Sequence, residues 1–367
     1  MLHRPLRIGF MLPGTFSVGN RGNGIAEQAR QQAQALERRG HTVLRLNPWE
    51  WQDERSLDVL HFFVGAATLD GVSRNRQLTK PGLLVFAPII DSNQALAAYR
   101  AAAVLGSVVP RFLTIPGMLR SQALASDAVI CRSVHEARRL SHGLGVGSEK
   151  IEIVLNGCTP ADGGAIDTAA VRATLGLPEE FLLHVSAFTQ ERKNVLRLAD
   201  AAQSLGYPLV IAGSSVPGPV LRELQRRVGR NDRIRLLGFV DAAVKQALFE
   251  MCRVFCLPSY HEGTGLAALE AAARGANIVI TQNGGPRDYF LQHADYADPF
   301  SVASIRGAIA SAWARPRSEA LRTHVTLNLS WDRSAAQLES LYERRLAAKH
   351  AGMGDTNSGA VQTAPGQ

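Results

Sequence analysis

The chain has 367 residues, a length at which two domains of about 150 residues each are expected instead of one hydrophobic core. Hydrophobic residues make up 46% of the chain, and no run of about 20 apolar residues occurs, so a disordered chain and a membrane-spanning helix are both excluded. The net charge of +8 predicts an anionic partner, but the basic residues are not interleaved with aromatic residues as in nucleic-acid modules, so we expect no nucleic acid.

The N-terminal segment predicts a strand, a loop, a helix and a second strand. Residues 7–12 are apolar, residues 13–24 are rich in Gly, Ser and Asn, and residues 25–39 have helical spacing. Gly40 ends this helix, and residues 41–46 form the next strand. Such a βαβ unit predicts a parallel sheet. Because the first apolar run is too short for the core of a signal peptide, we expect a cytoplasmic protein.

Short apolar segments and helical segments alternate along the rest of the chain. Further strands are predicted at residues 59–64, 82–89, 127–131, 151–155, 181–186, 209–212, 234–237, 254–257 and 277–281. Helices are predicted at residues 134–142, 220–228, 244–251 and 266–274. Two successive α/β blocks of this kind predict two facing, doubly wound Rossmann-like domains.

The domain boundary is placed at a stretch that contains Pro, Asp and two glycines. We therefore expect an N-terminal domain over residues 1–160 and a C-terminal domain over residues 161–330. A C-terminal helix is predicted over residues 331–350. Residues 351–367 are rich in Gly, Ser, Thr and Pro and lack apolar periodicity, so we expect them to be disordered.

The cysteines and acidic residues give no sign of a metal site. Cys131, Cys158, Cys252 and Cys256 are scattered, and the one close pair has no second pair to complete a zinc site. We expect all four to be reduced packing residues. The chain also has no Asp-x-Asp sequence, the usual bridge between a metal ion and a diphosphate, so no metal and no cofactor are expected.

The segment after the predicted strand at residues 254–257 passes through a glycine loop and opens a helix. The backbone amides of Gly265, Leu266 and Ala267 would then be free to bind an anion at the helix N-terminus. Two glutamates flank this helix start, Glu262 before it and Glu270 within it. One carboxylate can face a sugar while the other reaches a ribose; alternatively, the first caps the helix and the second faces solvent.

Residues 258–271 have the sequence Pro-Ser-Tyr-His-Glu-Gly-Thr-Gly-Leu-Ala-Ala-Leu-Glu-Ala. As a whole, this segment resembles the signature of the retaining GT-B glycosyltransferases of family GT4. The resemblance extends over roughly residues 125–345. It implies the GT-B fold, in which two Rossmann-like domains face each other across a cleft. It also implies a nucleotide-sugar donor, with Glu262 at the donor sugar and Glu270 at the ribose of the nucleotide.

Residues 184–194 end a predicted strand and carry the adjacent cations Arg192 and Lys193. In the family a similar loop neutralises the donor diphosphate and the charge that develops on the leaving group, so the resemblance assigns these two residues that role. The alternative is a solvated basic turn. Many relatives carry an arginine where this chain has Ala187, which leaves one fewer cation for the phosphates.

Three other positions follow the family less closely. Gly22 and Gly24 lie between the first strand and the first helix, where the family has a glycine-rich loop close to the donor phosphate and the acceptor. In the Asn-Gly-Gly-Pro-Arg loop, we place Arg287 where relatives have an acidic residue. Relatives often have a catalytic-site histidine in the N-terminal half, where residues 86–91 have none; His61 is the candidate, with a packed strand histidine as the alternative.

The resemblance implies transfer of a hexose-type sugar, mannose among the candidates, from a GDP- or UDP-linked donor to a glycan or lipid-linked acceptor. We expect retention of configuration, no metal, and a place in cell-surface polysaccharide assembly. The charge of +8 adds the expectation of peripheral contact with the anionic inner face of the plasma membrane. The alternatives are a nucleotide-sugar epimerase or a phosphorylase of the same fold, and a non-catalytic scaffold that binds a nucleotide sugar.

Overall fold

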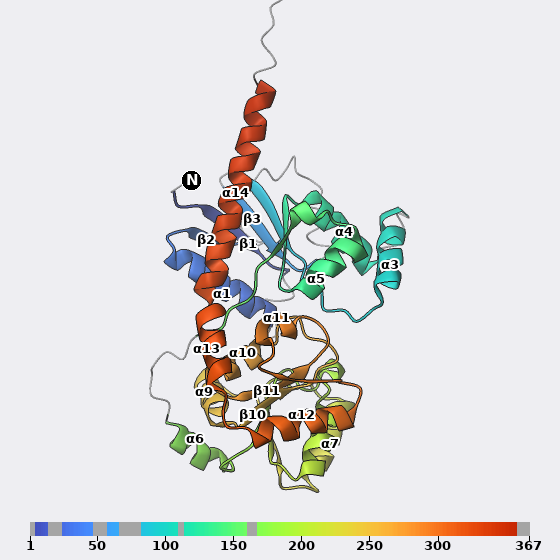
Figure 1. Cartoon of the computed structure of the whole chain (residues 1–367), viewed down its shortest axis with the longest axis vertical. Helices are drawn as coiled ribbons and strands as arrows, with labels where there is room; N and C mark the ends of the chain where they lie inside the picture. The colour runs from blue at the N-terminus through green and yellow to red at the C-terminus, as the bar shows by residue number, and fades with distance from the viewer. Residues whose placement is uncertain are drawn as a thin grey trace, which may run out of the picture.

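The computed structural model describes residues 4–13, 24–46, 57–65, 82–108, 114–159 and 167–357, and only the backbone of residues 352–357. The described chain forms two parallel six-stranded sheets, one in each half, with helices packed against them (Figure 1). Each sheet has a separate buried apolar cluster on each of its two faces. The predicted class, two doubly wound Rossmann-like units, is confirmed.

The first sheet has the strand order β2-β1-β3-β4-β5-β6, with every pair parallel. Its strands are β1 (Arg7–Met11), β2 (Thr42–Arg45), β3 (Val59–Phe63), β4 (Leu83–Ala87), β5 (Ala128–Cys131) and β6 (Ile151–Ile153). Its helices are α1 (Gly24–Arg38), α3 (Leu96–Val108), α4 (Ile115–Ala125) and α5 (Val134–Arg138). Every residue of β3, β4 and β5 is buried, as expected for parallel strands that helices cover on both faces.

The second sheet has the strand order β12-β11-β10-β7-β8-β9, again parallel throughout. Its strands are β7 (Leu182–Val185), β8 (Leu209–Ala212), β9 (Ile234–Gly238), β10 (Val254–Leu257), β11 (Asn277–Thr281) and β12 (Asp295–Ala297). Its helices are α6 (Thr168–Leu175), α7 (Val195–Leu205), α8 (Pro219–Val228), α9 (Ala242–Met251), α10 (Leu266–Ala273), α11 (Pro286–Phe290), α12 (Val302–Ala314) and α13 (Glu319–Asn328). Residues 160–166, where the domain boundary was placed, lie outside the described part of the chain.

The last helix, α14 (Trp331–Asn357), leaves the C-terminal half and runs along the N-terminal half (Figure 1). Its buried residues Trp331, Leu338 and Tyr342 belong to the same apolar cluster as α1 and β1. The helix begins at the predicted residue and continues to Asn357, into the segment from residue 351 onward that was predicted to be disordered. Residues 358–367 lie outside the described chain.

Loops that follow the carboxyl ends of strands bring the two halves into contact, and we call this region the junction. Asn93 Nδ2, in the loop after β4, donates to the Tyr260 carbonyl after β10 at 2.8 Å. The Val134 amide at the start of α5 donates to the Asp288 carboxylate of α11 at 2.7 Å. In open α/β sheets ligands bind at the carboxyl ends of strands, so the junction is where a site is expected.

Candidate active site

The buried strand β10 leads into a glycine loop that fixes the start of α10. Gly265 has φ +80, and a Cβ at this position would lie 2.9 Å from Ile280 Cδ1, so conformation and space both require glycine. No side chain among the described residues caps α10. The first amides of the helix, at Leu266 and Ala267, are therefore available to an anionic ligand.

Glu262, in the same loop, forms a buried ion pair with Lys193. Lys193 Nζ lies 2.6 Å from Glu262 Oε1, and both side chains are about nine-tenths buried. Burial alone would raise the pKa of the Glu262 carboxyl, but the charge and hydrogen bond of Lys193, together with the charge of Arg192, help to hold this pKa below its ordinary value. A negative and a positive group are thus fixed side by side at the end of β10.

Hydrogen bonds join the loop after β7 to the loop after β10. The Tyr260 amide donates to the Arg192 carbonyl at 2.8 Å, and Asn194 Nδ2 donates to the Pro258 carbonyl at 2.9 Å. Arg192 itself is exposed, and its charge helps to lower the pKa of Glu262. The two segments singled out in the sequence therefore meet, although Ala187, half-buried after β7, supplies no cation.

Glu270 occupies a different position from Glu262. It lies on α10 and pairs with Lys245 of α9, Nζ to Oε2 at 2.6 Å, and its side chain is partly exposed. The charge of Lys245 also contributes to the lowered pKa of Glu27 on α1, so this pair lies close to the N-terminal half. The structure does not place the two glutamates in direct contact.

The N-terminus of α1 meets the N-terminus of α10. A Cβ on Gly24, the first residue of α1, would lie 3.6 Å from Leu266 Cδ1. Leu266 also packs against the apolar clusters of both halves. The other predicted glycine of this loop, Gly22, lies outside the described residues.

Sequence reasoning missed Arg132, which follows β5 and lies at the junction. Its buried guanidinium contacts Asp91 Oδ1 at 2.9 Å and Glu136 Oε2 at 3.1 Å. A Cβ on Gly263 would lie 2.6 Å from Arg132 Nη2, so the glycine lets the arginine approach the loop that carries Glu262. An arginine directly after a buried strand was the available signal.

A buried polar network, also missed, crosses the junction around Tyr289 of α11. The Tyr289 hydroxyl donates to the Arg132 carbonyl at 2.8 Å and accepts from the Asn156 amide at 3.1 Å. Asn156 Nδ2 in turn donates to Gln28 Oε1 at 3.0 Å and to Thr264 Oγ1 at 3.1 Å. An Asn-Gly pair directly after the predicted strand at residues 151–155 was the available signal.

Two histidines from opposite halves also meet here. The rings of His135 on α5 and His261 beside Glu262 have centroids 5.1 Å apart. His61, by contrast, is fully buried in β3 with Nδ1 2.7 Å from the Tyr342 hydroxyl, and burial lowers its pKa to about 3. Of the two readings of His61, the structure supports the packed core histidine.

Helix α11, which follows β11, carries Arg287 and Asp288 side by side. The Arg287 guanidinium stacks over the Tyr296 ring, with its Cζ 4.2 Å from the ring centroid. The acidic residue is its neighbour Asp288, whose carboxylate accepts the Val134 amide of the other half. The placement of Arg287 at the position that is acidic in relatives stays a prediction.

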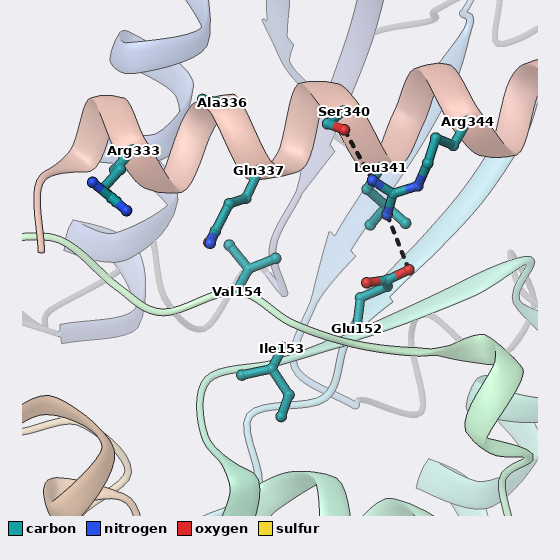
Figure 2. A pocket seen from close by; sticks show the side chains of 9 residues that line it. All are labelled: Glu152, Ile153, Val154, Arg333, Ala336, Gln337, Ser340, Leu341 and Arg344. Carbon is teal, nitrogen blue, oxygen red and sulfur yellow. Dashed lines mark hydrogen bonds and ion pairs between the residues drawn. The ribbon is translucent and has the colours of Figure 1, made fainter. Parts of the chain in front are cut away.

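A hollow of about 470 Å³ lies elsewhere, between β6 and α14 (Figure 2). Arg344 of α14 bridges Ser340 and Glu152 across it, at 2.9 and 3.2 Å. None of the predicted site residues lines it. The described residues contain no group of three His, Cys, Asp or Glu side chains placed to hold a metal ion, and all four cysteines are buried and unpaired.

Comparison with known proteins identifies relatives and structural neighbours. Residues 168–322 match the family described as Glycosyl transferases group 1. The chain is 26% identical over 274 residues to D-inositol 3-phosphate glycosyltransferase of Xylanimonas cellulosilytica, covering 70% of this chain and 66% of the relative. It is 29% identical over 239 residues to glycogen synthase of Mycobacterium tuberculosis, covering 61% and 55%. The matches thus span between about half and two thirds of these relatives.

Solved structures share the whole architecture at low sequence identity. Sucrose-phosphate synthase from Thermosynechococcus elongatus aligns with a TM-score of 0.71 at 18% identity, covering 94% of this chain and 100% of that one. The catalytic domain of starch synthase IV from Arabidopsis thaliana, bound to ADP and acarbose, aligns with a TM-score of 0.70 at 16% identity, with coverage of 94% and 100%. At these identities the likeness concerns the fold.

Proposed function

We propose that this chain is a glycosyltransferase that moves a hexose from a nucleotide diphosphate sugar to a glycan or lipid-linked acceptor. The match of residues 168–322 to the group 1 glycosyl transferases supports this proposal. Mannose is one candidate for the sugar, and GDP or UDP for the nucleotide. The observation that carries this proposal is the buried pair of Lys193 and Glu262 beside the uncapped start of α10. A buried charge pair at the carboxyl ends of strands is typical of functional sites.

In the proposed complex the donor diphosphate binds the amides at Gly265, Leu266 and Ala267, with Arg192 and Lys193 supplying positive charge. Such charge stabilises the nucleoside diphosphate as it leaves. Glu270 accepts hydrogen bonds from the ribose hydroxyls, and these bonds replace its contact with Lys245. This arrangement draws all of its positive charge from side chains and amides, and it requires no metal.

The proposed reaction retains the configuration of the sugar. The acceptor hydroxyl attacks from the face that the diphosphate leaves, so the new C–O bond forms as the bond to the phosphate oxygen breaks. The hydroxyl proton passes to the departing phosphate. Glu262 is held by Lys193 at 2.6 Å, which supports a positioning and electrostatic role for this carboxylate.

We further propose that the protein works in the cytoplasm, at the inner face of the plasma membrane, in cell-surface polysaccharide assembly. The support is α3, at the outer edge of the N-terminal half (Figure 1). Only Tyr99 and Ala103 of this helix are buried, whereas Val104, Leu105 and Val108 are 47%, 45% and 71% exposed.

The charge around α3 fits an anionic lipid surface. No Asp or Glu occurs between Asp91 and Asp127, a stretch that contains three arginines. An apolar helix face beside cationic side chains binds anionic membranes. No helix among the described residues is both long and apolar enough to cross a bilayer.

The membrane proposal predicts that Val108→Glu abolishes binding to vesicles. We expect the wild-type chain to float with vesicles of phosphatidylcholine and phosphatidylglycerol, and not with phosphatidylcholine alone. The matched control is Leu327→Glu on α13, where the leucine is 68% exposed; it should float like the wild type. Failure of the wild type to float at physiological salt would remove the membrane contact and leave sugar transfer untouched.

Calorimetric titration with GDP-mannose, UDP-glucose and UDP-N-acetylglucosamine tests the donor proposal. We expect one donor to bind, and Lys193→Ala and Glu270→Ala each to weaken it tenfold or more. Binding of no donor would contradict the transferase proposal. Binding without turnover of the donor would favour a non-catalytic scaffold, whereas conversion of the donor's sugar without any acceptor would favour an epimerase, and a requirement for free phosphate would favour a phosphorylase.

A further inference from the structure

His261 is a buried histidine in the loop between β10 and α10. It lies one residue before Glu262, and only 7% of the residue is exposed. Neither Nδ1 nor Nε2 has a hydrogen-bond partner among the described residues. Buried polar groups are nearly always paired, and an unpaired one costs about 1–3 kcal/mol. A ligand that hydrogen-bonds this ring would offset that cost.

The groups around His261 come from both halves of the molecule. His135 of α5 faces it from the N-terminal half, and Gly284 packs against its Cε1 from the C-terminal half. Asp91, in the loop after β4, and Glu262 both act electrostatically on the ring. Asp91 bonds Arg132 through Oδ1, and no described residue pairs with its Oδ2.

These surroundings favour a neutral ligand that is rich in hydroxyl groups. Burial lowers the pKa of His261 to about 4, so the ring is neutral at physiological pH and offers one donor and one acceptor. A hydroxyl can satisfy either nitrogen. A phosphate is disfavoured as the partner of this ring, because a neutral imidazole offers it no positive charge.

We propose that His261 hydrogen-bonds a hydroxyl of the sugar being transferred and thereby helps to select which sugar the donor carries. The inference rests on the proposed function, and it adds a specificity-determining residue to that site. His261 is adjacent to Glu262 in the chain, and Glu262 is held against Lys193, which we place at the diphosphate. A sugar attached to that diphosphate would lie within reach of both side chains.

Calorimetry with two ligands distinguishes a contact between His261 and the sugar from an effect of the substitution on the whole donor site. The first ligand is whichever of GDP-mannose, UDP-glucose and UDP-N-acetylglucosamine the wild type binds, and the second is the matching GDP or UDP. We expect His261→Ala to raise the Kd of the nucleotide sugar about fivefold to tenfold, the value of one hydrogen bond, and to leave the nucleoside diphosphate unchanged. His261→Gln, which restores a donor and an acceptor, should recover part of the loss.

The control is His350→Ala, an exposed histidine of α14, which should change neither Kd. Thermal unfolding of each variant establishes that the protein is folded. Equal weakening of both ligands, or no weakening of either, would overturn the role of His261 while the proposed function stands. If the wild type binds none of the three donors, the proposed function fails first, and this inference fails with it.

Discussion

Glu262 carries its negative charge in a buried position because the Lys193 ammonium lies 2.6 Å away. Burial opposes the ionised carboxylate, and the neighbouring groups together, first among them the Lys193 ammonium, outweigh burial, so the pKa is lowered on folding. A group whose pKa is lowered in the folded state adds stability above its unfolded pKa. That stability is lost as the pH falls through the folded pKa.

The effect of Glu262→Gln on the free energy of unfolding should therefore depend on pH. The variant should be less stable than the wild type at pH 7, and the difference in the free energy of unfolding should shrink as the pH falls below 4.5, the ordinary pKa of a glutamate. Urea denaturation of both proteins between pH 3 and pH 7, roughly spanning that transition, measures this difference. A difference that stays constant across the range would contradict an ionised Glu262 stabilised by Lys193.

At the residue scale, sequence motifs identified the residues that lie in one continuous segment and missed those that depend on contacts between distant segments. Glu262, Gly265 and Lys193 were singled out from local patterns, and the structure joins the first and the last of these. Arg132 could not be singled out in the same way, because its meaning comes from Asp91, 41 residues earlier in the chain. The catalytic roles of Glu262, Arg192 and Lys193 stay predictions.

At the scale of single elements, α10 shows how a glycine sets a helix start. The left-handed conformation of Gly265 turns the chain out of the loop, and Ile280 of β11 fills the space beside its Cα. The helix then begins at Leu266 with no side-chain cap among the described residues. The start of α10, where we place the diphosphate, depends on this one residue.

Gly265→Ala should destabilise the protein by about 2 kcal/mol, because alanine resists a positive φ and its Cβ meets Ile280. Donor affinity should fall as well. The same substitution at Gly307, an exposed position inside α12 with nothing within 4 Å of its Cβ, should stabilise by about 0.5–1 kcal/mol. Thermal unfolding and donor titration of both variants check this; equal effects at the two glycines would refute it.

The strands of both sheets could be predicted because parallel strands covered on both faces are continuous apolar runs. Several helices were not predicted, namely α3, α4, α6, α7, α11, α12 and α13. α3 and α12 are rich in alanine and other apolar residues, which weakens the contrast between a polar and an apolar face. The short strand β12 was missed for a different reason, since only one of its three residues is fully buried.

For the whole molecule, the path of α14 and the network around Tyr289 unite the halves. Neither could be predicted, because a helical pattern does not reveal which half the helix packs on. Arg39, directly after α1, pairs with Glu339 of α14, and Trp331 and Tyr342 fill the N-terminal core. The last helix thereby closes the apolar face of the opposite half.

Tyr289→Phe should lower the free energy of unfolding by about 1–3 kcal/mol, because it leaves the buried Asn156 amide and Arg132 carbonyl without this partner. Tyr207→Phe is the control. Tyr207 stacks on Trp313, and none of the described residues hydrogen-bonds its hydroxyl, so this change should be nearly neutral. Urea denaturation compares the two, and a neutral Tyr289→Phe would show that the network does not join the halves.

The proposed transfer with retention is tested most directly by the configuration of the first product. The wild-type chain is incubated with the α-linked donor that it binds and with methanol as a small acceptor, since a methyl glycoside does not change anomer afterwards. Proton NMR then identifies the glycoside. We predict the methyl α-glycoside, formed together with the nucleoside diphosphate; the methyl β-glycoside, or no release of nucleoside diphosphate from a donor that is bound, would contradict the proposed reaction.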